Sequence, residues 1–278
     1  MYRLGYTEST LLFVYYLKTI HNIDHTGSYI DKGLVNWLYS TSGFYDKKIK
    51  GDYFNFDAKA CRESEVYNTY MKIILEKIKI YDKKKIICMH KIPQKLQIYI
   101  KQFLEYINYD NGGYCHKHVI FDAIKLKNVL IIHNLGQLFK KQYESNKLKM
   151  IYPDLPDIKG MYIYEPGYTF CNTGPDESIL DTANKHCINI SEIIKKNNID
   201  SVIISCGAYS VLLASYIVEN HNIPVVCSGG ELPCYFGVIT KRNKNSKFRS
   251  SNNEEFWIPV PEDMRPVNYN KIEGGCYW

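Results

Sequence analysis

The stretch SVIISCGAYSVLLASYI, residues 201–217, contains the clearest strand–turn–helix signal in the chain. Residues 201–205 form a short, β-branched apolar run, which is typical of a parallel strand buried on both faces. A Cys-Gly-Ala-Tyr turn follows, and a helical apolar pattern covers residues 211–219. A strand that leads through a glycine turn into a helix is half of a βαβ unit, so this stretch predicts an α/β fold.

The same alternation recurs on both sides of this stretch. Residues 129–133 and 223–227 have the composition of buried strands, and residues 86–89 are a weaker candidate. Helical patterns cover residues 136–145 and 181–197. Strands that alternate with helices predict a Rossmann-like, mostly parallel sheet flanked by helices.

The first part of the chain has a different pattern. Its helical patterns cover residues 8–19, 27–39, 65–81 and 91–106. Residues 40–57 are rich in Gly, Tyr and Phe and predict an ordered loop, whereas the polar residues 241–255 predict a mobile one. We therefore expect a single domain with a helix-rich N-terminal portion, 1–115, and a Rossmann-like nucleotide-binding portion, 116–278.

The composition of the chain limits the classes of protein to which it can belong. The chain has 278 residues, of which 45% are hydrophobic and 23% charged, as in globular proteins. No apolar run reaches the roughly 18 residues of a membrane span, so we expect a soluble, cytoplasmic protein. The net charge of +6 comes mostly from lysine. Lysine side chains on a solvent-exposed surface explain this positive charge. A surface that binds nucleic acid is the alternative, but arginine is scarce and no stacking motif is present.

The nine cysteines include no CxxC pair. Without a secretory signal, this spacing favours neither a disulfide framework nor a zinc site.

Glycine, serine or other polar residues follow three of the predicted strands, at residues 133–137, 205–210 and 228–231. In open parallel sheets, ligands bind beyond the carboxyl ends of the strands. A helix starting near Ala208 would offer free N–H groups to a phosphate, although any βα turn favours glycine and serine. There is neither a P-loop nor a GxGxxG motif. The candidate nucleotide-binding residues in these loops and the following basic pair are Asn134, Cys206, Gly207, Ala208, Tyr209, Ser228, Gly229, Gly230, Lys241 and Arg242.

Two residues are candidates for proton transfer. His133 ends a strand, where it is either a satisfied core histidine or a group that contacts a phosphate or moves a proton. Glu8 follows a glycine turn, where it either complements a helix dipole or acts as a general base or metal-facing carboxylate. The aromatic ending Tyr277-Trp278 predicts docking on the protein body, either for stability alone or to close the site.

Several segments together resemble a family from bacterial surface-polysaccharide gene clusters. The matching motifs, in chain order, are R-x-G-x-x-E at Arg3, Gly5 and Glu8, a strand ending at His133 before Lys141-Gln142-Tyr143-Glu144, CGAY at 206–209, a Gly-Gly loop, F-G-I-x-x-K-R from Phe236 to Arg242 with Val238 at the Ile position, and EGGCYW at 273–278. This family is similar to the GT-D-type glycosyltransferases, in which a D-x-E pair lies near the nucleotide sugar. Tyr6 stands here where that Asp would be.

The resemblance implies a glycosyltransferase that moves a sugar from a nucleotide-sugar donor, with a UDP-sugar favoured, to a glycan or other hydroxyl acceptor. Arg3 and Gly5 would join the donor site, and Glu8 would be the base or a ligand of Mn²⁺ or Mg²⁺, with His133 as the second candidate base. A single carboxylate is a poor site for either metal ion. Two alternatives stay open: a non-catalytic nucleotide- or glycan-binding protein, and another sugar-phosphate enzyme. The sequence predicts no oligomeric state.

Overall fold

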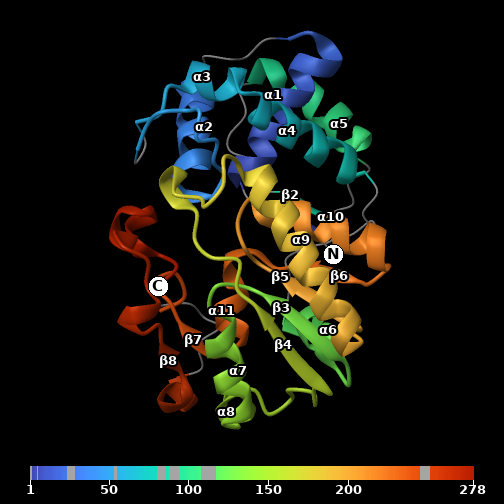
Figure 1. The fold of residues 1–278 in the computed structure, drawn as a ribbon, viewed down its shortest axis with the longest axis vertical. Helices are drawn as coiled ribbons and strands as arrows, with labels where there is room; N and C mark the ends of the chain where they lie inside the picture. Colours follow the sequence, from blue (N-terminus) through green and yellow to red (C-terminus); the bar gives the residue numbers. More distant parts are fainter. Residues whose placement is uncertain are drawn as a thin grey trace. The chain divides into compact units, whose positions relative to one another are not determined.

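The computed structural model describes residues 2–4, 6–23, 29–52, 55–79, 85–87, 94–107, 117–244 and 251–278 (Figure 1). The chain divides into two compact units. Unit 1 comprises Met1–Tyr114, Thr169–Cys187 and Gly207–Tyr216; unit 2 comprises Cys115–Tyr168, Ile188–Cys206 and Ile217–Trp278. The boundary after residue 114 is close to the expected one, but the two inserted segments belong with the N-terminal part.

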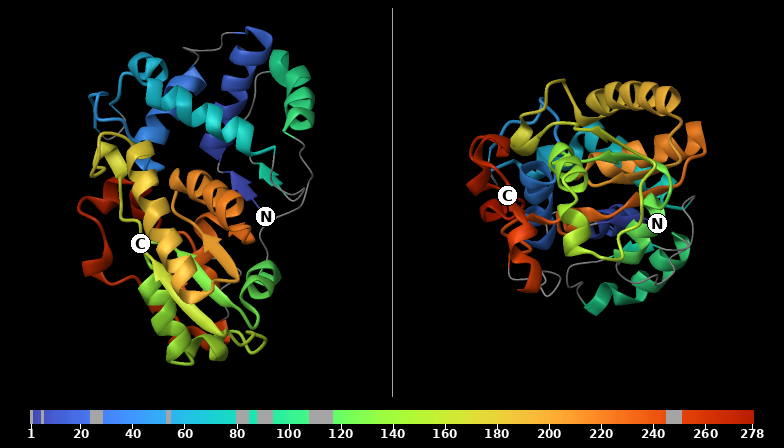
Figure 2. Two further views of the ribbon diagram at one scale, coloured as in Figure 1. Left: turned by 45° about the vertical axis from the view of Figure 1, so that its right-hand side comes forward. Right: turned by 90° about the horizontal axis from the view of Figure 1, so that it is seen from below.

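Unit 2 contains a four-stranded parallel sheet of β3 (Asn128–Ile132), β4 (Gly160–Tyr164), β5 (Ser201–Ile204) and β6 (Val225–Cys227), which confirms the α/β class. Figure 2 shows these strands side by side from two further directions. β3 and β5 are buried along their whole length, and both lie within a residue of their predicted bounds. β4 was not predicted: most of its side chains are half-exposed, and its sequence GMYIY differs from the β-branched runs of the buried strands.

The strand order is β4-β3-β5-β6. The chain first steps from β3 to β4, then crosses back to the other side of β3 to form β5, and continues outward to β6. The direction of winding therefore reverses between β3 and β5. In open parallel sheets ligands bind outside the carboxyl ends of the strands at such a switch point, here beside residues 133–134 and 205–206.

Short elements complete unit 2. They are α6 (Lys117–Ile124), α7 (Gly136–Glu144), α8 (Lys147–Ile151), α11 (Leu232–Tyr235) and the parallel pair β7 (Val238–Ile239) and β8 (Ile258–Pro259). α6 packs on β3 and β5, and α7 packs on β4. Trp257, Ile151 and Cys234 form a small core under the pair. Residues 245–250 of the loop predicted to be mobile lie outside the described residues.

Two long helices begin in unit 1 and end in unit 2. They are α9 (Ile179–Asn197) and α10 (Tyr209–His221), and each extends a predicted helix by two residues at its start. Because α9 and α10 follow β4 and β5 in the chain, the inserted segments of unit 1 are the connections that leave these two strands.

Unit 1 is mainly helical. Its helices are α1 (Tyr6–His21), α2 (Tyr29–Thr41), α3 (Ala58–Glu63), α4 (Glu65–Lys77) and α5 (Gln97–Tyr106). Strand β1 (Tyr2–Leu4) pairs in parallel with β2 (Lys85–Ile87), whereas residues 88–89 of that predicted strand lie outside the described residues. The predicted helices therefore exist, with shifted ends, and the described part of residues 42–57 contains no helix or strand.

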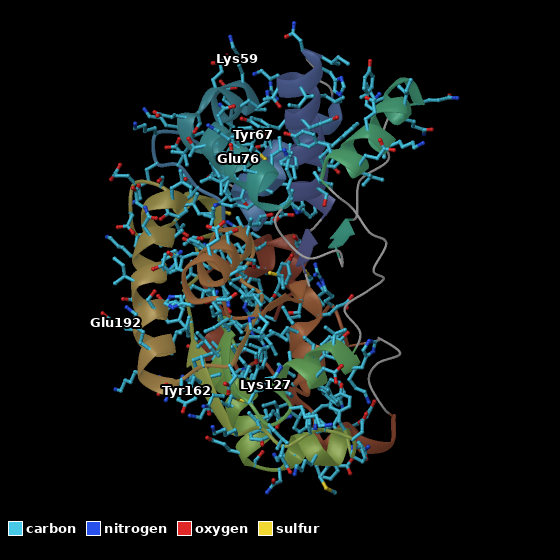
Figure 3. All side chains as sticks on the ribbon, turned by 90° about the vertical axis from the view of Figure 1, so that its right-hand side faces the viewer. Lys59, Tyr67, Glu76, Lys127, Tyr162 and Glu192 are labelled. Carbon is cyan, nitrogen blue, oxygen red and sulfur yellow. The ribbon has the colours of Figure 1, made fainter. Side chains whose placement is uncertain are left out.

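Aromatic side chains build the core of unit 1. Phe13 of α1 meets Phe103 of α5 at 5.4 Å between ring centres, and Phe44 contacts both Tyr39 and Tyr70 at 4.8 and 4.9 Å. Such pairs add about 0.5–1.5 kcal/mol each beyond the area they bury. Figure 3 shows Tyr67 among the helices and Lys59 at the surface. Within the described ranges, the helices are too short or too polar to cross a membrane.

Candidate functional site

Asn134 joins the loops that follow β3 and β4 in unit 2. Its side-chain Nδ2 donates to the carbonyl of Gly167 at 2.9 Å, and its Oδ1 accepts from the Gly167 N–H at 2.8 Å. The neighbouring carboxylate of Glu165 accepts from the N–H of Gln137 at 3.0 Å, in the first turn of α7. A carboxylate at this end of a helix complements its dipole. The ends of β3 and β4 are thus held together by side chains.

His133 is a partly buried, neutral histidine directly after β3. Its Nδ1 accepts from the N–H of Leu135 at 2.9 Å, so its hydrogen is on Nε2, and its ring lies 4.9 Å from that of Phe139. Burial lowers the pKa of His133 to about 3. A base with this pKa is too weak to take a proton from a hydroxyl at neutral pH, so the structure favours the interpretation of His133 as a core histidine that can donate from Nε2.

Substituting His133 with Asn should flatten the pH dependence of stability. The pKa is about 3 in the folded chain and about 6.5 when unfolded, so between these values the unfolded state binds more protons and stability falls as the pH drops. From pH 6.5 to pH 5 the wild type should lose about 2 kcal/mol through this residue. Asn keeps an acceptor for Leu135 but does not titrate. Urea unfolding at several pH values measures the effect; parallel curves for both proteins would contradict it.

The ends of β5 and β6 are also tied together in unit 2. The hydroxyl of Ser205 donates to the carbonyl of Gly229 at 2.8 Å, and the N–H of Ser228 donates to Ile204 at 3.1 Å. Ser228 is completely buried, and among the described residues its hydroxyl has no hydrogen-bond partner. An unpaired buried hydroxyl costs about 1–3 kcal/mol and is a group that a polar ligand would satisfy.

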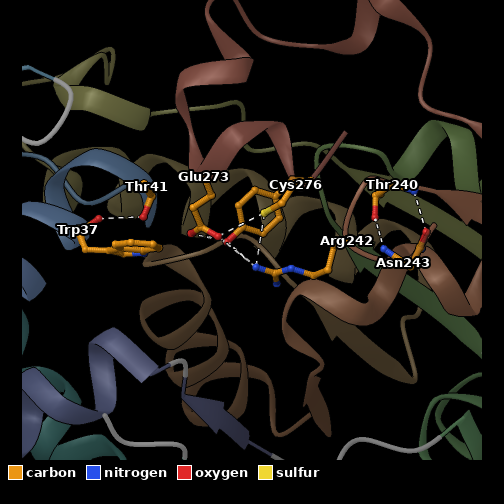
Figure 4. Close-up of polar contacts among 8 residues, drawn as sticks. Trp37, Thr41, Thr240, Arg242, Asn243, Glu273 and Cys276 are labelled. Carbon is orange, nitrogen blue, oxygen red and sulfur yellow. Dashed lines mark hydrogen bonds and ion pairs between the residues drawn. The ribbon is translucent and has the colours of Figure 1, made fainter. Parts of the chain in front are cut away.

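Arg242 is the best-defined cationic group near these loops (Figure 4). Its Nη2 donates to Oε2 of Glu273 and to the hydroxyl of Tyr277, each at 3.2 Å, and its guanidinium lies 4.5 Å from the centre of the Tyr277 ring. A Cβ added to Gly230 would overlap Nη1 of Arg242. Burial by itself lowers the pKa of Arg242, but Tyr277, Cys276 and Glu273 together raise it, so the guanidinium stays charged.

Residues 273–278, which we call the 273–278 segment, bind to Lys241 and Arg242 within unit 2. The backbone N–H groups of Lys241 and Arg242 donate to the carbonyls of Trp278 and Cys276 at 3.1 and 2.9 Å. Nζ of Lys241 donates to the carbonyl of Gly274 at 2.7 Å.

Trp278 anchors the end of this segment. It is 6% exposed, and its Nε1 donates to the hydroxyl of Tyr168 at 3.0 Å. Tyr168 follows β4, whereas Gly230, beside Arg242, follows β6. The 273–278 segment and its partner Arg242 therefore connect the loops after the two edge strands.

The CGAY turn is divided between the units. Cys206 belongs to unit 2, whereas the next three residues belong to unit 1. Gly207 has φ +58°, and a Cβ there would overlap the carbonyl oxygen of Ser42. The N–H of Ala208, expected to be free for an anion, instead donates to that same oxygen at 2.7 Å. Tyr209 is 2% exposed and its ring lies 5.2 Å from that of His186. Within unit 1, Gly207 therefore lets the backbone of the CGAY turn lie close to the backbone of Ser42.

The N-terminal candidates are only partly described. Gly5 lies outside the described residues, and of Arg3 only the backbone, in β1, is described. Glu8 is half-buried in the first turn of α1 in unit 1, where it complements the helix dipole. In the part of the chain that the structure describes, no group of three or more His, Cys, Asp or Glu side chains could hold a metal ion. The residues present therefore do not fit Mn²⁺ or Mg²⁺ without further ligands.

Three residues that shape the site were not predicted from the sequence: Glu165, Gly167 and Tyr168. They belong to the stretch Glu-Pro-Gly-Tyr, a turn signal that would have been placed correctly had residues 160–164 been interpreted as a strand.

Comparisons with family models, with curated proteins and with solved structures gave no match to this chain.

Proposed function

We propose that the chain is a glycosyltransferase that uses a nucleotide-sugar donor, with a UDP-sugar favoured, and a glycan or other hydroxyl acceptor. The supporting observation is that the predicted loops after β3 and β5 flank the switch point of the unit 2 sheet. The motif resemblance from Arg3 to Trp278 supplies the reaction class. Neither NAD nor ATP motifs compete with this assignment.

In this proposal the diphosphate lies beside Gly229 and Gly230, where Arg242 stabilises the charge that develops on the leaving group. The hydroxyl of Ser228 gains a partner on the ligand. Of the two candidate bases that the resemblance implies, the low pKa of His133 disfavours that residue and leaves Glu8. No step uses a metal ion, since the described residues do not fit one.

Glu8→Gln should lower turnover at least 100-fold, because general-base catalysis contributes about 10²–10⁴-fold. The measurement is product formation and donor hydrolysis with a panel of UDP-, GDP- and dTDP-sugars. Glu65→Gln is the matched control, since Glu65 stands in the first turn of α4 as Glu8 does in α1. Both variants lose the same small dipole interaction. Unchanged turnover in Glu8→Gln would show that the assigned role is wrong.

A non-catalytic nucleotide-binding protein is the second candidate. Tyr6 at the position of the family's Asp favours it. Stabilisation by UDP without turnover of any donor would support this alternative. Binding of a sugar phosphate in preference to a nucleotide would instead indicate another sugar-phosphate enzyme.

A further inference from the structure

The guanidinium of Arg242 has two edges with different surroundings. Nη2 donates to the side chains of Glu273, Cys276 and Tyr277. Nη1 instead lies against Gly230, in the loop after β6, where the absence of a side chain leaves room for it. One edge is therefore held by the 273–278 segment, and the other is directed at the loop proposed to hold a diphosphate.

Glu273 is fixed where it meets Arg242. Its Oε1 accepts from the hydroxyl of Tyr277 at 2.9 Å while Oε2 accepts from Arg242, so both carboxylate oxygens have partners. Its backbone has φ +48°, a left-handed conformation that costs a non-glycine residue about 1–2 kcal/mol. The next two residues, Gly274 and Gly275, also have positive φ. This unfavourable turn brings the carboxylate to the guanidinium.

We propose that Glu273 and Tyr277 are positioning residues for Arg242. They hold the Nη2 edge, so that the Nη1 edge is presented beside Gly230 to one phosphate group of an anionic ligand. The planar fork of an arginine suits this division, because its two edges bind independently and its orientation decides which oxygen it meets. The inference rests on the proposed function for the identity of the ligand, a nucleoside diphosphate.

The opposite role for Glu273 is competition with the ligand for Arg242. The geometry disfavours it, because the segment that carries Glu273 is bound through the backbone of Lys241 and Arg242 and through the buried Trp278. A carboxylate that competes with the ligand would have to move away from Arg242 when the ligand binds, whereas Glu273 belongs to a segment that is held in place. The two roles predict opposite signs: removing the charge of Glu273 weakens binding if it positions Arg242 and strengthens binding if it competes.

The test is a double-mutant cycle measured by titration calorimetry with UDP and, separately, inorganic pyrophosphate. We expect Glu273→Gln to weaken binding about tenfold and Arg242→Ala to weaken it further. In the Arg242→Ala background, Glu273→Gln should have no additional effect, which a merely structural role would not produce. Glu262→Gln, an exposed carboxylate of the same region, is the control for net charge and should bind as the wild type does.

Each outcome separates the two proposals. UDP binding that Glu273→Gln leaves unchanged, or tightens, overturns the positioning role while the proposed function stands. Pyrophosphate binding that follows the cycle, without UDP binding, supports the positioning role and overturns the proposed function. Failure to bind either ligand overturns both. If Glu273→Gln does not fold, Tyr277→Phe replaces it, since it keeps the ring under the guanidinium and removes only the hydroxyl contacts.

Discussion

Replacing Gly207 with alanine is expected to lower the free energy of unfolding by about 3 kcal/mol. Roughly 1 kcal/mol comes from forcing alanine into φ +58°, and about 2 from overlap with a packed neighbour. That neighbour is the carbonyl of Ser42, a backbone atom that cannot swing aside like the end of a side chain. Moving it would also break its bond to the N–H of Ala208.

Urea unfolding followed by circular dichroism measures this loss, with Gly167→Ala as the control. Gly167 also has a positive φ, +83°, but no atom lies within 4 Å of its added Cβ, so the variant should lose only about 1 kcal/mol. Equal losses for the two variants, together with a fall in UDP affinity for Gly207→Ala alone, would contradict the structural role. The glycine of the CGAY turn would then serve a ligand.

In contrast to Gly207→Ala, Gly230→Ala is expected to change ligand binding and not stability. It should weaken UDP binding by at least about tenfold while the fold stays intact. Its Cβ would displace Nη1 of Arg242, and a charge-assisted hydrogen bond to a phosphate is worth about 1.5–3 kcal/mol. Stability changes little, because the overlapping atom is at the far end of a long, flexible side chain and Gly230 has no positive φ.

Titration with UDP measures the affinity, and thermal unfolding checks the fold. Gly33→Ala is the matched control: Gly33 lies in α2, its added Cβ meets no atom within 4 Å, and alanine is the better helix former. That variant should bind UDP as the wild type does. If Gly230→Ala also binds UDP with unchanged affinity, Arg242 does not contact the diphosphate.

The buried strands were predictable because their signal is local. β3 and β5 are buried along their whole length and apolar after their first residue, so composition alone located them within a residue. β4 is an edge strand with half-exposed side chains, and its Tyr-rich sequence lacks the β-branched composition of a strand buried on both faces. The division into two units was not predictable, because it depends on which segments pack together after the chain has folded.

The candidate site was predictable as a set of loops but not as a set of contacts. Residues after β3, β5 and β6 were singled out correctly as strand ends. The partners of Gly207 and Arg242 were not, since Ser42 and Glu273 are far from them in sequence. A glycine turn has the same sequence whether it accommodates a carbonyl or a phosphate, and only the fold distinguishes the two.

A crystal structure of the chain with UDP and Mn²⁺ tests the proposed donor site most directly. We expect the diphosphate beside Gly229 and Gly230, with one phosphate oxygen within hydrogen-bond distance of Nη1 of Arg242 and the Arg242–Glu273 pair unchanged. A diphosphate bound anywhere else in the chain, or a UDP complex in which Arg242 makes no contact with phosphate, would contradict it.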